Sequence, residues 1–205
     1  MNAAIDVILA SGSPRRRAIL AEAGVPAIVL VPGIDDAAAP ADGSNPTAYV
    51  MSLAWFKARQ AMADAQAAFG AGGPRWIVAA DTMCVRDGAV IGKPADRDEA
   101  ESMIRGFAGR THAVVTGVCI VDRATGARTI FADEAHVTLG ALGDAALAAY
   151  LAGEGWRGKA GGYNYADRVA DGWPLACEGD PETVMGLPSA LVLCALARMR
   201  AEAGA

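Results

Sequence analysis

Residues 9–17 read Leu-Ala-Ser-Gly-Ser-Pro-Arg-Arg-Arg, an apolar strand end that runs through a small-residue turn into a segment with three arginines. Ser13 is a favourable N-cap and Pro14 suits the first helical position, so we expect a helix to begin at Pro14. Its backbone N–H groups and positive dipole end then face the turn, where an anion binds well. Arginines at this place oppose the dipole, which makes sense if a polyanion such as phosphate sits in front of them. For an isolated segment, a solvated basic turn is the simpler interpretation.

Composition limits the classes of partner. The chain has 205 residues, of which 53% are hydrophobic and 20% charged, so it suits one large domain or two small lobes with a substantial core. The net charge of −5 argues against a general binder of nucleic-acid polymers, because such proteins carry a basic surface that displaces counterions. A small anionic ligand remains compatible with an acidic protein, since a local cluster of side chains can be positive.

The cysteines and histidines point away from disulfides and zinc. The four cysteines are widely spaced without a CxxC pair, which favours buried thiols in a reducing compartment: Cys84, Cys119, Cys177 and Cys194. His112 and His136 each lie in a strand-like stretch, and we expect them at a pocket edge or on a strand surface.

Hydropathy indicates a protein that contacts no membrane. No apolar run approaches the roughly 20 residues of a membrane span, and the charges near the N-terminus follow the apolar segment instead of preceding it. We therefore expect a cytoplasmic protein.

Strand-like and helix-like segments alternate along the chain, which predicts the α/β class and a single domain over residues 1–205. The expected strands cover residues 4–10, 25–31, 76–85, 90–91, 112–121 and 128–139. The expected helices cover residues 14–23, 46–65, 98–107, 144–151 and 188–202. Residues 153–187 are rich in Gly, Asp, Tyr and Trp with weak periodicity, and a long irregular segment of this kind is usually functional or disordered.

Lys57 lies close to the apolar face of the long helix expected after Asn45-Pro46. A lysine there either extends past its neighbours to water or points into a cleft, and periodicity alone favours the first interpretation.

Asp81 follows five apolar residues of a strand, Trp-Ile-Val-Ala-Ala at 76–80. Ligands of open α/β sheets gather beyond the carboxyl ends of strands, so an acidic residue at this place is well positioned for chemistry. Residues 86–89, Arg-Asp-Gly-Ala, predict a tight hairpin that brings Lys93 back near the level of Asp81. A carboxylate and an ammonium at one end of a hairpin suit phosphate or metal-phosphate binding.

Six short motifs carry a resemblance that covers nearly the whole chain. In order they are Leu-Ala-Ser-Gly-Ser-Pro-Arg-Arg at 9–16, Ala-Asp-Thr at 80–82, Gly-Lys-Pro at 92–94, Gly-Arg-Thr-His at 109–112, Lys-Ala-Gly-Gly-Tyr at 159–163 and Val-Met-Gly-Leu-Pro at 184–188. The same motifs recur in the same order in the Maf family of nucleoside triphosphate pyrophosphatases, also called septum formation inhibitors. The chain therefore resembles that family.

The resemblance implies a fold and a set of site residues. The fold is a mixed, twisted sheet flanked by helices, with two lobes around a central cleft, and the oligomer is a homodimer. Asp81 falls on the catalytic acid that accepts the proton of the attacking water, and Lys93 belongs to the same catalytic set. The remaining positions fall on substrate contacts: Ser11, Arg15, Arg16, Asp36, Lys57, Thr82, Lys159 and Ala166.

The reaction that follows is cleavage of a nucleoside triphosphate into the monophosphate and pyrophosphate. Mg²⁺ or Mn²⁺ would bridge phosphate oxygens and the carboxylates of Asp36 and Asp81, because these ions prefer oxygen ligands and the chain lacks a nitrogen or sulfur cage. Asp36 stands where the family usually has glutamate, so whatever it holds lies closer to the backbone. Housecleaning of non-standard nucleotides and restraint of septum formation could both follow from one such site.

The base stays unassigned at this point. Where the branch that prefers dTTP and UTP usually has a glutamine, this chain has Ala166, which has no hydrogen-bonding side chain. Asn164, Asp167 or Arg168 then read the base differently, or the site is permissive, while Thr82, linked to specificity in the family, is retained.

Two other classes of function remain open. A nucleotide-binding regulator of division would need the arginines but not Asp81, and a nucleotidyltransferase would need a second substrate besides water. Retention of Asp81, Lys93 and Lys159 together favours hydrolysis.

Overall fold

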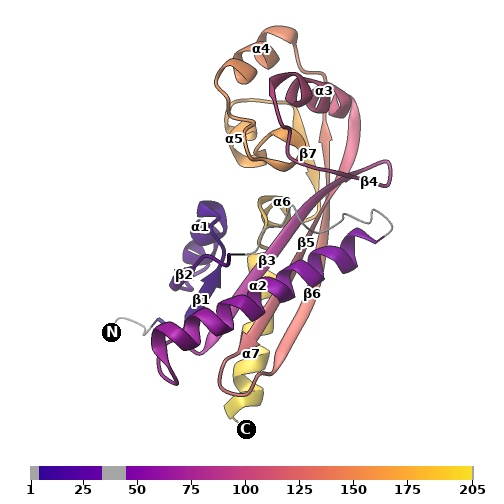
Figure 1. Ribbon diagram of the computed structural model, residues 1–205. Coiled ribbons are helices and arrows are strands. Elements are labelled where there is room, and N and C mark those ends of the chain that lie inside the picture. Colours follow the sequence, from indigo (N-terminus) through magenta and orange to yellow (C-terminus); the bar gives the residue numbers. More distant parts are fainter. Residues whose placement is uncertain (1–4, 34–44, 205) are drawn as a thin grey trace. The chain divides into compact units, whose positions relative to one another are not determined.

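The computed structural model describes residues 5–33 and 45–204, and Figure 1 shows the elements that they form. Asp36 lies outside the described residues. The strands are β1 (Val7–Ala10), β2 (Ala27–Leu30), β3 (Trp76–Arg86), β4 (Ala89–Ile91), β5 (Arg110–Asp122), β6 (Arg128–Leu139) and β7 (Leu175–Glu178). The helices are α1 (Pro14–Glu22), α2 (Pro46–Phe69), α3 (Arg97–Phe107), α4 (Asp144–Ala152), α5 (Tyr165–Ala170), α6 (Pro181–Met185) and α7 (Ser189–Gly204), with the short 3-10 helix η2 (Ala160–Gly162).

The strands form a mixed sheet in the order β2-β1-β3-β5-β6-β7, with β4 paired to β3. β1 runs parallel to β2 and to β3, whereas β3–β4 and β6–β7 are antiparallel. The predicted α/β class with a mixed sheet is therefore confirmed.

The contacts divide the chain into two compact units. Unit 1 comprises Met1–Thr82, Thr116–Asp133 and Gly186–Ala205, and unit 2 comprises Met83–Val115 and Glu134–Met185. The sequence of β3, β5 and β6 thus contributes to both units. The cleft between two lobes and the homodimer stay predictions.

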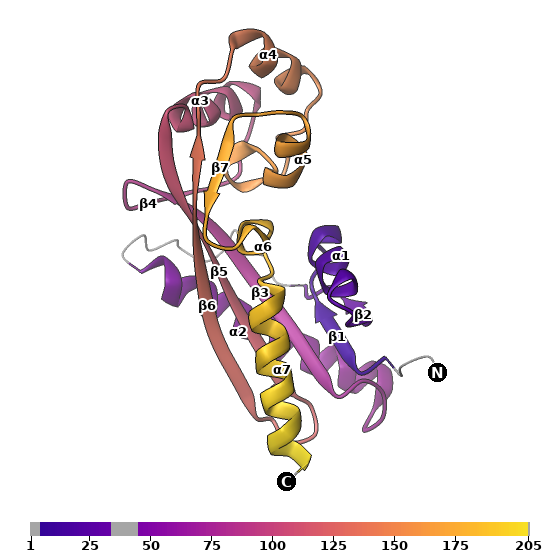
Figure 2. The same ribbon diagram turned by 180° about the vertical axis from the view of Figure 1, so that it is seen from behind.

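In unit 1, strand alternation and helix periodicity sort the side chains onto two faces of the sheet. α2 covers one face with Ala54, Ala58, Ala61 and Ala65, whose small side chains let the helix pack closely on the sheet. That cluster includes Ile8 and Ala10 of β1, Ile77 and Ala79 of β3, and Cys119 and Val121 of β5. α7 covers the opposite face, as the front and back views of Figures 1 and 2 show.

Local signals in the sequence explain where the elements begin and turn. Asn45 caps α2 by accepting from the N–H of Ala48, and Asp96 caps α3 by accepting from that of Glu99. Asp87 and Gly88 both have positive φ, 51° and 76°, as a tight hairpin turn requires, and Arg86 pairs with Ala89 as predicted.

Three expectations need correction. Lys57 does not extend to water: it is 9% exposed and faces a carboxylate. Cys84 and Cys119 are buried as expected, but Cys177 is only partly buried and Cys194, on α7, is exposed. His112 is inside the core of unit 2 instead of at its edge, whereas His136 is on the strand surface.

The irregular stretch at 153–187 contains short elements, namely η2, α5, β7 and α6. No helix in the parts of the chain that the structure describes is long and apolar enough to cross a membrane.

Candidate active site

The turn after β1 forms as the sequence predicts. Ser13 caps α1 by accepting a hydrogen bond from the N–H of Arg16, and Pro14 occupies the first turn of the helix. Ser11 is buried, and its hydroxyl oxygen accepts from the Ser13 N–H at 3.2 Å. The two serine side chains therefore already satisfy backbone donors of the turn. Phosphate binding by this turn stays a prediction, as does a substrate contact by the half-buried Arg15.

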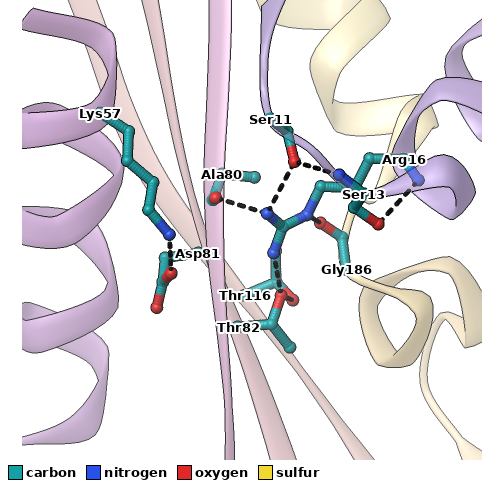
Figure 3. A network of polar contacts seen from close by, with 9 residues as sticks. All are labelled: Ser11, Ser13, Arg16, Lys57, Ala80, Asp81, Thr82, Thr116 and Gly186. Carbon is teal, nitrogen blue, oxygen red and sulfur yellow. Dashed lines mark hydrogen bonds and ion pairs between the residues drawn. The ribbon is translucent and has the colours of Figure 1, made fainter. Parts of the chain in front are cut away.

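Arg16 directs its guanidinium into the protein (Figure 3). Its Nε donates to the carbonyl of Gly186 at 2.8 Å, and its Nη1 donates to the carbonyl of Ala80 at 2.7 Å and to the Ser11 hydroxyl at 3.3 Å. Its Nη2 donates to the Thr82 hydroxyl at 2.9 Å. Four of the five N–H donors that an arginine carries are thus turned to protein atoms. Whether Arg16 also contacts a substrate stays a prediction.

Asp81 continues the row of β3 side chains that face α2. Residues 77, 79 and 81 alternate onto the same face, and Lys57 projects toward that face from α2. The ammonium Nζ of Lys57 lies 2.5 Å from Oδ1 of Asp81, and the residues are 9% and 7% exposed. An ammonium this close favours the ionised carboxylate, which is the form that accepts a proton. The sequence placed both residues in the site but did not show that they pair.

Thr116 and Gly186 are polar neighbours of the site that sequence reasoning did not single out. Thr116 lies on β5 with 0% exposure, and its Oγ1 shares a hydrogen bond with Oγ1 of Thr82 at 2.9 Å. Gly186 has φ of 99°, and a Cβ there would stand 3.1 Å from both Nε of Arg16 and Oγ1 of Thr82. Gly186 falls within the sixth motif, so its place in a motif was the available signal. Thr116 had no comparable signal, because a threonine inside a strand is unremarkable by itself.

Unit 2 holds the two other predicted lysines on neighbouring loops. The N–H of Gly161 donates to the carbonyl of Gly92 at 3.0 Å, which ties the segment after Lys159 to the segment before Lys93. Gly161 has φ of 72°, and a Cβ there would stand 3.3 Å from the ring of Phe107, so both its conformation and the space around it favour glycine. Lys159 donates to the carbonyl of Gly155 at 2.7 Å, and Lys93 is exposed. Asp81 belongs to unit 1, so the predicted proximity of Lys93 to Asp81 stays a prediction.

Ala166 lies in the first turn of α5 and is partly exposed. Beside it, Nδ2 of Asn164 donates to Oδ2 of Asp167 at 2.5 Å, which sets the orientation of the Asn164 amide. The Arg168 guanidinium stacks over the rings of Tyr150 and Trp173 at 4.5 and 5.5 Å, and it pairs with Asp171 at 2.8 Å. Which of Asn164, Asp167 and Arg168 contacts a base is not tested by these contacts and stays a prediction.

His112 belongs to the aromatic core of unit 2. Its Nε2 lies 2.9 Å from the Tyr163 hydroxyl and its ring centroid 4.2 Å from that of Phe107. Burial, with a smaller contribution from the charge of Arg86, lowers the pKa of His112 to about 4. The ring is therefore neutral at physiological pH and acts in packing and hydrogen bonding.

Of the two carboxylates predicted to hold a metal ion, the structure describes one, that of Asp81. Within residues 5–33 and 45–204, no group of three or more His, Cys, Asp and Glu side chains is arranged to hold a metal. Mg²⁺ commonly takes one or two carboxylates and completes its shell with water and phosphate oxygens, so the Asp81 carboxylate fits such an ion. Asp36, the second predicted ligand, is outside the described residues.

Fold and site together define a mixed α/β protein in which an Asp–Lys pair and an arginine-centred network lie at the middle of β3, just beyond the end of β1. A family model described as Maf-like protein matches residues 6–199. A dTTP/UTP pyrophosphatase of Nitratidesulfovibrio vulgaris is 40% identical over 196 residues, covering 96% of this chain and 89% of that protein. A dTTP/UTP pyrophosphatase of Salinibacter ruber is 37% identical over 182 residues, covering 89% and 85%. The chain belongs to the Maf-like protein family, as its motifs predicted.

Proposed function

We propose that this protein hydrolyses nucleoside triphosphates to nucleoside monophosphates and pyrophosphate. The observation that carries the proposal is the buried Lys57–Asp81 pair, in which Asp81 lies on β3 just beyond the end of β1. A general base must be deprotonated and held in place, and the Lys57 ammonium favours both conditions for Asp81. The relatives named dTTP/UTP pyrophosphatase give the reaction class.

In the proposed reaction, a water oxygen attacks the α-phosphorus while Asp81 accepts the water proton. The bond from the α-phosphorus to the bridging oxygen breaks, and pyrophosphate leaves with that electron pair. Positive side chains stabilise the charge that grows on the phosphoryl oxygens. For Arg15, Lys93 and Lys159 this role rests on the motifs alone.

A divalent cation completes the proposal. Asp81 and Asp36 are the carboxylates that would hold Mg²⁺ or Mn²⁺, which neutralises phosphate charge when bound. The proposed substrates start with dTTP and UTP, because the relatives bear those names. The Ala166 region makes a wider panel necessary, since alanine cannot hydrogen-bond a base.

The test replaces Asp81 with asparagine (Asp81→Asn). The asparagine Oδ1 still accepts a hydrogen bond from Lys57, so folding and nucleotide binding should persist while turnover falls by roughly 10³-fold or more, since no base remains. Pyrophosphate and monophosphate are quantified for normal and modified nucleoside triphosphates with Mg²⁺, Mn²⁺ or Co²⁺. Nucleotide binding is measured by calorimetry.

The matched control is Asp87→Asn, at the exposed hairpin turn where asparagine tolerates the positive φ equally well. It should retain wild-type turnover. An Asp81→Asn variant with normal turnover would remove Asp81 from the mechanism. A wild-type protein that binds nucleotides but releases no pyrophosphate would instead favour a nucleotide-binding regulator of septum formation.

A further inference from the structure

Six residues from four separate segments of unit 1 form a connected polar network around Arg16, shown in Figure 3. We call it the Arg16 network; its members are Ser11, Arg16, Ala80, Thr82, Thr116 and Gly186. Its contacts fall on Ala80 and Thr82, the two residues that flank Asp81. The network therefore holds β3 through the Ala80 carbonyl on one side of Asp81 and through the Thr82 hydroxyl on the other.

The network has a clear physical cause in the register of the sheet. The last pair between β1 and β3 is Ala10 with Ala79, so the next carbonyl of β3, that of Ala80, lies beyond the last residue of β1. The guanidinium of Arg16 donates to it. An arginine from the first turn of α1 thus continues the hydrogen bonding of β3 where the partner strand has ended.

Thr116 joins the network from β5, through its hydrogen bond to Thr82. It is fully buried, and its neighbour Gly117 packs directly on the backbone of α2: a Cβ at Gly117 would stand 2.5 Å from the Val50 carbonyl carbon. Close backbone packing leaves little room for this part of β5 to shift. The Thr116 hydroxyl is consequently held in a fixed position, where it can hydrogen-bond Thr82.

We propose that Thr116 is a positioning residue for the reaction, acting through Thr82 and Arg16 to hold the Asp81 segment of β3. This inference rests on the proposed function, because it assigns Asp81 the role of base. A base displaced by a fraction of an ångström loses rate while substrate affinity is kept, so the effect belongs in kcat and not in KM.

The test uses Thr116→Val, which keeps the shape of the side chain and removes the hydroxyl. We expect kcat to fall about tenfold with KM within about twofold of wild type. Thr116→Ser, which keeps the hydroxyl, should restore kcat to within about threefold. The matched control is Thr138→Val, because Thr138 forms the same kind of hydroxyl pair with Thr111, at 2.7 Å, on an exposed part of β5 and β6. It should leave kcat unchanged.

Normal kcat in Thr116→Val would overturn the inference, and so would equal losses in Thr116→Ser and Thr116→Val, since the methyl packing would then be the cause. If Thr116→Val does not fold, Gly186→Ala provides a second route, because its Cβ would press on Arg16 and Thr82. That variant should also lose kcat, and normal kcat would again overturn the inference.

Amide hydrogen exchange separates this inference from the proposed function. Thr116→Val should speed exchange at residues 80–83 at least tenfold, while Thr138→Val should not. If wild type releases no pyrophosphate, the proposed function fails and the exchange rates still decide whether Thr116 holds this segment. Unchanged exchange at residues 80–83 in Thr116→Val would overturn the positioning role in either case.

Discussion

Lys57 and Asp81 are both buried, and they form an ion pair in which each charge compensates the other. Removing one partner of a buried ion pair leaves a charge without compensation, which costs several kcal/mol of folding free energy. The pair therefore couples stability to the chemistry of the site.

We predict that Lys57→Met lowers the free energy of unfolding by about 3 kcal/mol at neutral pH, since the Asp81 carboxylate loses its ammonium. The double variant Lys57→Met/Asp81→Asn leaves no buried charge and should recover part of that loss. Urea unfolding of the two single variants and the double variant gives the coupling energy. Strictly additive losses would contradict a direct interaction between the two side chains.

The sequence predicted both residues as site members, but periodicity alone gave Lys57 the wrong environment. A helical wheel shows that Lys57 is near an apolar face and does not show what faces it. Ser13 and Pro14 were predictable for the opposite reason, because a helix cap is decided by residues three positions apart.

α2 ends in a cap supplied by a distant part of the chain. Arg123, in the turn between β5 and β6, donates to the carbonyls of Gly72 and Pro74 at 2.9 and 2.7 Å. It also donates to the carbonyls of Ala65 and Gly70 at 3.3 and 2.9 Å. One guanidinium thus joins the last turn of α2, the loop after it and the strand pair.

Replacing Arg123 with methionine (Arg123→Met) should lower the free energy of unfolding by about 2 kcal/mol, because four carbonyls lose their charged donor. For a chain of this size the melting temperature should fall by about 4 to 8 °C. The control is Arg59→Met on the exposed side of α2, which should change stability by less than about 0.5 kcal/mol. Equal effects of the two replacements, measured by thermal unfolding, would rule out the cap.

Elements were predictable where their signals are local. The hairpin at 86–89 and the start of α1 followed from turn and cap residues, whereas the Arg123 cap depends on the fold bringing residues about fifty positions apart together. The strand register that leaves the Ala80 carbonyl to Arg16 has the same origin, because pairing between strands is decided by the whole sheet.

For the molecule as a whole, the buried and neutral His112 lowers the free energy of unfolding in acid. The folded state keeps His112 neutral down to a pKa of about 4, while an unfolded histidine has a pKa near 6.5. As pH falls from about 6.5 toward 4, the unfolded state takes up this proton first, so stability is present above the window and is lost within it.

The loss due to His112 should reach roughly 3 kcal/mol by pH 4. His112→Gln keeps a hydrogen-bonding atom for Tyr163 and should remove most of this pH dependence. Urea unfolding at several pH values, compared with His136→Gln on the exposed strand surface, measures the difference. If wild type and His112→Gln lose stability in parallel, His112 does not titrate in this way.

For the whole chain, the order of the six motifs was enough to predict the family. It did not show how the motifs divide between the two compact units. Motifs one, two and six belong largely to unit 1, and motifs three, four and five to unit 2. That division arises from contacts between segments distant in sequence, to which no single motif refers.

Because β1 is short, the number of residues between its end and Arg16 should be fixed. Three residues, Ser11, Gly12 and Ser13, separate the end of β1 from α1, and the third residue of α1 must arrive beside the Ala80 carbonyl. A residue added within the first helical turn would rotate the following side chains by about 100° around the helix axis, away from that carbonyl. The turn after β1 therefore acts as a spacer of set length, in which residue number matters as much as residue type.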